Sequence, residues 1–312
     1  MKKIIRLITL LLCVCLLSVC FSGCEKDLEG KIEISGDKIT LEEVNSIIEQ
    51  RKTDYPQDEE GAVKEEWFNI EISLITITDM PEPESASING DVTNNEILLS
   101  GKVGFLDEDK MALDLQINAD IDVVVFEESE VKKDEKYTLS GKLILLDEVY
   151  YLDFIKTTVE DGAEKSENIK KTGGKEVLDE FAGLEEMKML LEDLNSECNF
   201  DSIDLEMLDI PNLDSGDAES AVAFYKTEDK IFAESKNNLF VLGNGFKYVI
   251  QHEYEFEKDS SLIKTKRVYT RLYAKMGIGG VKMKVDVEIS FNMQRIAPAV
   301  IVAPDLEGYE KA

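Results

Sequence analysis

Cys24 is the residue whose position in the chain points most directly to a chemical modification. It follows the small pair Ser22-Gly23, and an apolar run from Leu7 to Val19 lies ahead of it, after a basic start within residues 2–6. Such a start, run and small-residue site are typical of a secretory signal. The run is shorter than the ~20 residues of a transmembrane helix. A cysteine directly after the cleavage site is typical of bacterial lipoproteins, in which its thiol forms a thioether with diacylglycerol.

The sequence therefore predicts cleavage before Cys24 and anchoring of the mature chain to the membrane by lipid, which is stable when more than one acyl chain is attached. Cys20 is the rival site, but a valine precedes it, where the signal peptidase prefers a small residue. The predicted organisation is a signal peptide at 1–23, a lipidated tether at 24–38 and a single domain at 39–312. The amino-acid composition is rich in Lys, Ile and Glu, which favours a Gram-positive host, with the protein on the outer face of the cell membrane.

The charge of the chain restricts its partners. It has 65 Asp and Glu against 35 Lys and Arg, a formal net charge of −30. Such a charge repels nucleic acid, so nucleic acid is excluded as a partner. We interpret the acidic residues as a solvated surface, with divalent-cation binding as the alternative. Residues 212–217 hold oxygen ligands but lack the alternating acids and the distal Glu of an EF-hand. No metal-binding motif is predicted, and calcium binding by the acidic loops stays open.

Side chains with catalytic chemistry are few. His252 is the only histidine, so a zinc site with two histidines is excluded, and a Ser-His-Asp triad would have to use this ring. Its alternating surroundings predict a histidine within a strand. Cys198 is the only cysteine after Cys24, and neighbouring carboxylates disfavour the thiolate that a nucleophile needs. We predict no enzymatic activity and no cofactor, and a hydrolase with paired carboxylates is the least favoured alternative.

Two segments have helical periodicity. The first begins with a capping box at Thr40-Leu-Glu-Glu43, and apolar residues at helical spacing follow it. This pattern predicts a helix that stops at Asp54-Tyr-Pro56. The second follows a charged stretch at 160–175, interpreted as a loop, and predicts a helix at about 175–194. This second helix is expected to lie on a sheet with one apolar face, which includes Phe181, Leu184 and Leu191.

Between Trp67 and Thr158 the apolar period changes to two, which predicts β-strands. Residues 111–125 form the longest alternating run. The run is much longer than an average strand, so a bend or break near Ala119 is expected.

A short repeat supports a meander of hairpins. Residues 99–108 and 139–148 both begin with Leu-Ser-Gly-Lys and end with Asp-Glu, and each is interpreted as a strand that enters a turn. Gly101 and Gly141, inside these strands, predict a bulge or a tight bend.

Strands resume towards the C-terminus, most clearly at 246–256 and 281–291. A four-residue turn at 258–261 gives a register with two charge pairs, Glu255 with Lys264 and Glu253 with Lys266. The apolar faces of the two strands do not coincide in this register. Either a bulge intervenes or both faces of the sheet are partly covered.

These features together resemble the LolA/LppX superfamily of lipoprotein carriers and lipid-binding envelope proteins: a lipidated cysteine, an N-terminal helix, a long meander, an inserted apolar helix, further strands, and the ending Pro304-Asp-Leu-Glu-Gly-Tyr309. The resemblance implies an α+β fold that is mainly antiparallel β. It implies a curved, unclosed β-barrel, or half-barrel, with the N-terminal and inserted helices on its concave face and an apolar cavity for acyl chains.

Two functions follow as expectations. In the first, the anchored lipoprotein binds an acyl chain, a lipid or a similar apolar ligand in the concave sheet. The residues expected to line the cavity are Phe181, Leu184, Leu191, Leu113, Leu115, Ile117, Val285 and Val287. In the second, the same apolar stripes form a solid core, and the acidic surface contacts an envelope protein in a non-enzymatic assembly.

Overall fold

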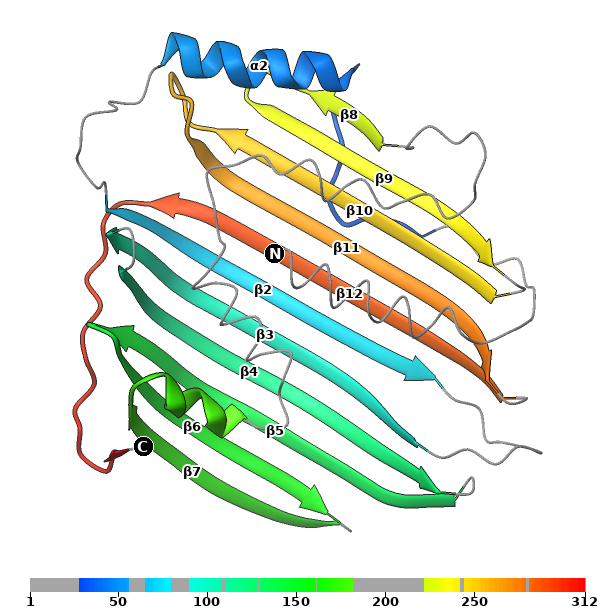
Figure 1. Cartoon of the computed structure of the whole chain (residues 1–312), viewed down its shortest axis with the longest axis vertical. Helices are drawn as coiled ribbons and strands as arrows, with labels where there is room; N and C mark the ends of the chain where they lie inside the picture. The colour runs from blue at the N-terminus through cyan, green and yellow to red at the C-terminus, as the bar shows by residue number, and fades with distance from the viewer. Residues whose placement is uncertain are drawn as a thin grey trace.

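The computed structural model describes residues 28–55, 65–79, 90–107, 110–127, 130–160, 162–181, 222–241, 244–278 and 281–311. Within them the chain forms one sheet of 13 strands, one α-helix and one short 3-10 helix (Figure 1). The elements are β1 (Asp37–Ile39), α2 (Leu41–Asp54), β2 (Glu66–Asp79), β3 (Gly90–Asp107), β4 (Lys110–Glu127), β5 (Glu130–Leu146), β6 (Val149–Glu160), β7 (Ala163–Gly173), η1 (Lys175–Phe181), β8 (Val222–Lys226), β9 (Lys230–Val241), β10 (Asn244–Phe256), β11 (Ile263–Ile278), β12 (Val281–Ile296) and β13 (Glu310–Lys311).

The strands follow the order β1-β8-β9-β10-β11-β12-β2-β3-β4-β5-β6-β7-β13. Two meanders, β2 to β7 and β8 to β12, meet where β12 pairs antiparallel with β2. Every pairing is antiparallel except that of β13, which runs parallel to β7. Because β1 and β13 stand at opposite ends of this order, the described strands form an unclosed sheet. The expectation of a mainly antiparallel, unclosed α+β fold is confirmed at this level, and the half-barrel fits it.

Helix α2 begins at the predicted capping box. The Thr40 hydroxyl oxygen accepts a hydrogen bond from the Glu43 amide at 3.2 Å, and the Glu43 carboxylate accepts one from the Thr40 amide at 2.7 Å. Val44 is fully buried in the main apolar cluster. Near the other end, the Arg51 guanidinium carbon lies 4.3 Å from the centre of the Phe256 ring. The helix therefore packs at the end of the sheet where β10 stops.

Strand β4 is one continuous strand of 18 residues. Ala119 pairs with Ile97 of β3 on one side and with Leu139 of β5 on the other. The predicted break near Ala119 is therefore wrong. A strand with a neighbour on both sides has partners for its backbone groups, so at about 3.3 Å per residue it can extend for almost 60 Å.

The two repeat copies form the predicted hairpins, β3 with β4 and β5 with β6. Gly101 pairs with Leu115, and neither Gly101 nor Gly141 interrupts the register, so the predicted bulges are absent there. A Cβ added to Gly101 would lie only 2.1 Å from the carbonyl oxygen of Asp114. The glycine thus permits a close approach of neighbouring strands.

The charged stretch at 160–175, predicted as a loop, is largely a strand. β7 pairs with β6 from Ala163 to Gly173, and residues 163–168 are exposed. A strand this close to the sheet edge is held by its ladder and keeps charged side chains in solvent. It therefore lacks the apolar alternation by which strands are recognised in a sequence.

The element that follows β7 is a 3-10 helix, η1. Its residues Val177 and Leu178 are buried in the main apolar cluster, so η1 packs on the sheet as expected for the start of the inserted helix. The remainder of the predicted helix, from residue 182, lies outside the described residues.

The hairpin of β10 and β11 contains the expected bulge. Phe256 lies opposite Ile263, as the predicted turn requires, but the ladder then shifts by one residue at Lys264, so that Glu255 lies opposite Thr265 and not Lys264. The predicted pairing of Glu253 with Lys266 is therefore wrong, since Glu253 lies opposite Arg267 and Lys266 lies opposite Tyr254. The shift brings the apolar residues of β10, β11 and β12 into line, as in the row Tyr248, Leu272 and Val287.

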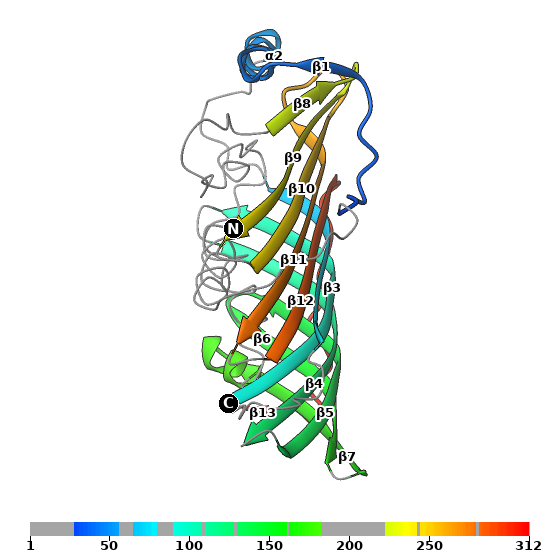
Figure 2. The same cartoon turned by 90° about the vertical axis from the view of Figure 1, so that its right-hand side faces the viewer.

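Both faces of the sheet carry apolar clusters. The larger cluster defines what we call the core face, and it extends from β8 to β7. The opposite face carries two smaller clusters, built around Ile32, Phe232, Val249 and Tyr269 and around Trp67, Ala112, Ile144 and Ile301. Residues 28–36 run along the opposite face (Figure 2), where the Ile32 amide donates to the Gln251 side-chain oxygen at 2.9 Å. The segment predicted as a tether thus packs on the sheet through Ile32.

Candidate ligand-binding face

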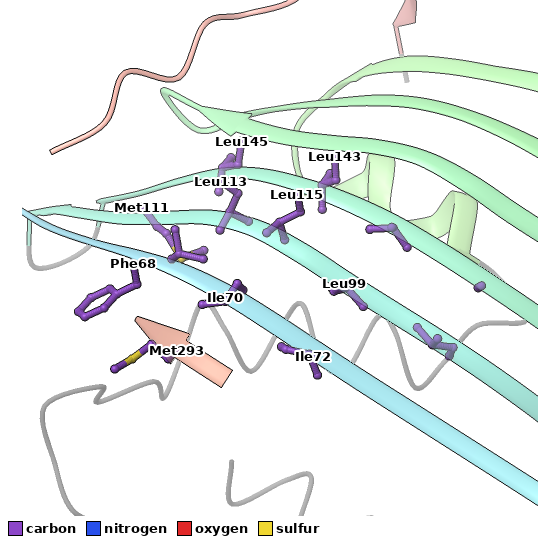
Figure 3. Packing of buried hydrophobic residues seen from close by; sticks show 14 of the residues in the cluster. Phe68, Ile70, Ile72, Leu99, Met111, Leu113, Leu115, Leu143, Leu145 and Met293 are labelled. Atoms are coloured by element: carbon purple, nitrogen blue, oxygen red, sulfur yellow. The ribbon is translucent and has the colours of Figure 1, made fainter. Parts of the chain in front are cut away.

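The core face is a continuous apolar surface over the middle of the sheet. Figure 3 shows side chains of β2, β3, β4 and β5 gathered there, with Met293 of β12 beside them. Their alternation within each strand sends every second residue to this face. Buried members with less than 2% exposure include Phe68, Leu99, Leu113, Leu115, Ile117, Leu143 and Leu152.

The strand register arranges this face in rows that run across the strands. One row passes from Lys266 through Met293, Ile70, Gly101 and Leu115, and continues through Leu143 and Leu152. With strands about 4.8 Å apart, the four steps from Lys266 to Leu115 cover about 19 Å. The row therefore connects one cationic residue to a long apolar stretch.

Three of the predicted cavity-lining residues, Leu113, Leu115 and Ile117, lie together on the core face and are buried. Val287 is buried and Val285 half-buried on the same face. The two groups are separate, because Val287 lies six residues along β12 from Met293 of the Leu115 row, about 20 Å.

The remaining predicted residues are not placed relative to this face. Phe181 ends η1, but its side chain is outside the description, and Leu184, Leu191 and the lipidation site Cys24 lie outside the described residues.

A buried polar group lies within the core face. Lys266, His252 and Tyr254 are 1%, 0% and 0% exposed. The His252 Nδ1 atom and the Tyr254 hydroxyl oxygen are 2.9 Å apart, and the Lys266 ammonium lies 5.7 Å from the centre of the Tyr254 ring. Burial, with a smaller contribution from the positive charge of Lys266, lowers the pKa of His252 to about 3.

The second nitrogen of this histidine differs from the first in having no described partner. Among the residues that the structure describes, none forms a hydrogen bond with His252 Nε2, although the atom is buried. A buried polar atom without a partner is uncommon in folded proteins and marks a position that a bound molecule can satisfy.

Sequence reasoning placed His252 in a strand, which is confirmed, but missed Lys266. A signal was present, because Val268, Leu272 and Ala274 are each an even number of residues away from Lys266. In a strand, residues at such spacing point to the same face. The predicted charge pair with Glu253 hid it, since a residue-for-residue ladder from the turn gives Lys266 the opposite phase.

Glu253 instead joins an ion-pair network on the opposite face. Its carboxylate accepts from Lys230 Nζ at 2.6 Å and from Arg267 at 2.9 Å, and its side chain is 5% exposed. The hydrogen bond from Lys230 to Glu253 raises the pKa of that lysine. The predicted contact between Glu255 and Lys264 survives the bulge as an ion pair of 2.5 Å. These contacts hold β9, β10 and β11 together.

A second polar group fixes the N-terminal segment to the opposite face. Lys31 forms an ion pair with Glu288, and the Tyr269 hydroxyl donates to the same carboxylate at 3.2 Å. Burial, followed by the charge of Glu288, raises the pKa of Tyr269 to about 12. Arg271 and Asp286 form a bidentate pair nearby, at 3.0 and 2.7 Å.

The described residues contain no group of three or more His, Cys, Asp or Glu side chains arranged to hold a metal ion, and residues 212–217 lie outside them. No helix in the described part of the chain has the length and apolarity to cross a membrane.

Comparisons with known proteins give no family. No family model matches the chain, and no curated protein matches it. Among solved structures, it is similar to a beta-barrel-like protein of domain of unknown function DUF1849 from Brucella abortus, with 8% identity and a TM-score of 0.18 over 74% of this chain and 98% of that chain. It is also similar to the translocator domain of autotransporter NalP from Neisseria meningitidis, with 6% identity and a TM-score of 0.17 over 82% of this chain and 96% of that chain. Such scores carry no argument about activity, so a function must be proposed from the residues themselves.

Proposed function

We propose that this chain is a lipid-anchored lipoprotein of the outer face of the cell membrane, whose core face binds the acyl chain of a lipid or similar amphiphile. The observation that carries the proposal is the row of apolar side chains that crosses neighbouring strands through Met293, Ile70, Leu115 and Leu143. The LolA/LppX resemblance of the sequence supports the same function. Ligand sites are mostly apolar with few polar groups, and the core face has this composition.

A second candidate is a non-enzymatic assembly lipoprotein with a solid core. Val300 and Val302 of the C-terminal segment favour it, since they are 85% and 72% exposed. Exposed apolar side chains together with a net charge of −30 suit contact with an envelope protein. This candidate requires no small-molecule ligand on the core face.

Titration of the mature, unlipidated protein with a fluorescent fatty-acyl probe distinguishes the two. The first function predicts saturable binding with a negative heat-capacity change, because apolar surface is buried. Absence of saturable binding leaves the assembly function as the better account.

A pair of variants locates the probe. Leu115→Phe adds bulk on the core face, and we expect it to weaken a long-chain probe more than a short-chain one. Gln116→Phe makes a similar change at the next residue, which is exposed and faces the other side, so it should leave both affinities unchanged. Equal effects of the two variants would contradict binding on the core face.

A further inference from the structure

In the described sheet, one side of β7 is largely without a strand partner. Its inner side pairs with β6 over its whole length, from Ala163 to Gly173. On the outer side, β13 is its only neighbour among the strands that the structure describes, and β13 pairs only with Lys171 and Thr172. The side chains of residues 163–168 are exposed. A strand edge of this kind can receive a strand from another chain.

The charge of this edge differs from that of the chain as a whole. The chain has 65 Asp and Glu against 35 Lys and Arg, so two copies repel each other at long range. β7 instead holds three lysines and two glutamates. Salt at physiological ionic strength screens exposed charges beyond about 8 Å, so a contact confined to β7 depends mainly on these balanced charges. A second copy of the chain can therefore approach here.

The geometry of antiparallel pairing restricts how two copies of β7 can meet. In such a pair, directly opposite residues either both point their backbone groups at the partner strand or both point them away. Between two identical strands, this condition holds only when the two-fold axis passes through a residue and not between two residues. The residue on the axis then lies opposite itself, and its two neighbours lie opposite each other.

Ser166 is the position at which the charges match. With the axis there, Lys165 lies opposite Glu167 of the second copy, and the symmetry produces this ion pair twice. Within each copy Lys156 of β6 already lies opposite Glu167, so the signs of the charges alternate across the contact. An axis through Glu164, Lys165 or Glu167 would instead set a charge against itself.

The same register fits the length of the edge. It pairs Ala163 with Ile169 and ends there, before Lys171, the first residue of β7 that pairs with β13. An axis through Asn168, the other uncharged position of the exposed stretch, would set Lys165 opposite Lys171 and compete with β13. Charge and length thus select one register.

We propose that two copies of the chain dimerise by antiparallel pairing of residues 163–169 of β7 about a two-fold axis through Ser166. The two sheets of 13 strands become one continuous sheet. A two-fold axis places both N-terminal segments at the same height along the axis, so two copies anchored at Cys24 fit one bilayer that lies perpendicular to it. The interface is small, so the dimer is weak in solution and is favoured by the high local concentration at a membrane. The inference is independent of acyl-chain binding.

Disulfide cross-linking tests the register. Ser166→Cys, made together with Cys198→Ser, places the only cysteine after Cys24 on the proposed axis. Directly opposite residues of an antiparallel pair have Cα atoms about 4.5–5.5 Å apart, a separation that a disulfide spans. We expect treatment of cells that express the full chain with copper phenanthroline to convert this variant to a covalent dimer.

Asn168→Cys in the same background is the matched control. Residue 168 is exposed and lies on the same face of β7 as Ser166. The proposed register separates the two copies of residue 168 by four positions, about 13 Å along the strand. The control should therefore cross-link at least tenfold more slowly than Ser166→Cys.

Charge reversal tests the ion pairs. Added to the Ser166→Cys variant, Lys165→Glu and Glu167→Lys each replace two attractive pairs by two repulsive ones, and each should slow cross-linking about tenfold. Combining both changes restores opposite charges and should recover the original rate. A lysine beside the thiol favours the reactive thiolate, so slower cross-linking in Glu167→Lys cannot result from a less reactive cysteine.

The outcomes decide the proposal without reference to the acyl probe. Rapid cross-linking at Ser166, slow cross-linking at Asn168 and recovery in the double reversal support the dimer. Equal rates at the two positions, no cross-linking at Ser166, or a rate that neither single reversal lowers would each overturn it. Acyl binding is measured separately, so its presence or absence leaves this result unchanged.

Discussion

A single residue, His252, makes the unfolding free energy of the protein depend on pH in the acid range. Its pKa is about 3 in the folded protein, against an ordinary value of 6.5. As the pH falls below 6.5, the unfolded chain takes up a proton that the folded protein refuses, so the folded state loses about 1.4 kcal/mol per pH unit until about pH 3. Burial and the positive charge of Lys266 both act in this direction, since each lowers the pKa of His252.

We therefore expect His252→Phe to remove this slope. Relative to the wild type, the variant should gain about 2 kcal/mol of unfolding free energy between pH 7.5 and pH 5. Urea unfolding of both proteins at several pH values measures the difference, in which the many carboxylates cancel. Parallel stability curves would show that the ring is not buried as described.

Gly101 gives a second residue-scale prediction. Its φ of 153° and the 2.1 Å approach to the Asp114 carbonyl oxygen leave no room for a Cβ. Gly101→Ala should lower the unfolding free energy by about 2–4 kcal/mol through backbone displacement and strain. Ser100→Ala, at the preceding residue, should change it by less than about 1 kcal/mol. Denaturant titration compares the two, and equal midpoints would refute the close approach.

At this scale the sequence identified apolar positions well and polar ones less well. Leu113, Leu115 and Ile117 were predictable because alternation alone determines their face. Lys266 was missed although its own strand carried the signal, because the ladder drawn from the turn lacks the one-residue bulge at Lys264 and gives Lys266 the wrong face.

Among the elements, the N-terminal segment at residues 28–36 was expected to be only a tether, but it packs on the sheet. Ile32 is 5% exposed and packs with Phe232, Val249 and Tyr269 of β9, β10 and β11. A true tether would contribute nothing to stability.

We expect Ile32→Ala to lower the unfolding free energy by about 2–4 kcal/mol, the usual range for loss of a buried isoleucine side chain. Glu33→Ala, at the adjacent exposed position, serves as the control and should have an effect within about 0.5 kcal/mol. Thermal unfolding of the three proteins provides the measurement. A neutral Ile32→Ala would return residues 28–36 to the status of a tether.

Elements with a clear sequence pattern, such as a capping motif or a regular spacing of apolar residues, were predictable, and elements without one were not. The capping box fixed the start of α2, and the repeat fixed two hairpins. β7 was missed because a strand next to the sheet edge can keep its charged side chains in solvent, as residues 163–168 do.

For the whole molecule, the sequence indicated one meander and further strands towards the C-terminus, but not how the two groups of strands join. The pairing of β12 with β2 connects residues more than 200 positions apart. Such a contact leaves no local pattern, so its register follows only from the folded sheet. It also makes folding slow, since loop closure must precede the pairing.

The proposed lipid anchor also concerns the whole molecule. Cys24→Ser should abolish labelling of the protein with radioactive palmitate and release it from the membrane fraction, because its thiol is the predicted attachment point. Cys20→Ser is the matched control and should remain labelled. If the Cys24 variant kept the label, the lipid would be attached at another residue.

The docked N-terminal segment also determines how this protein responds to a mechanical load. If the chain is anchored at Cys24, as we propose, a pull between the membrane and the sheet acts first on residues 28–39, which are held by the Ile32 cluster, the bond to Gln251 and the three residue pairs of β1 with β8. Under such a pull these contacts would break one after another. The pairings between the long strands would carry the force only after the segment has detached. Each residue released lengthens the connection by at most about 3.5 Å. In an anchored protein, detachment of this segment would therefore let the sheet move away from the bilayer while the long ladders stay folded.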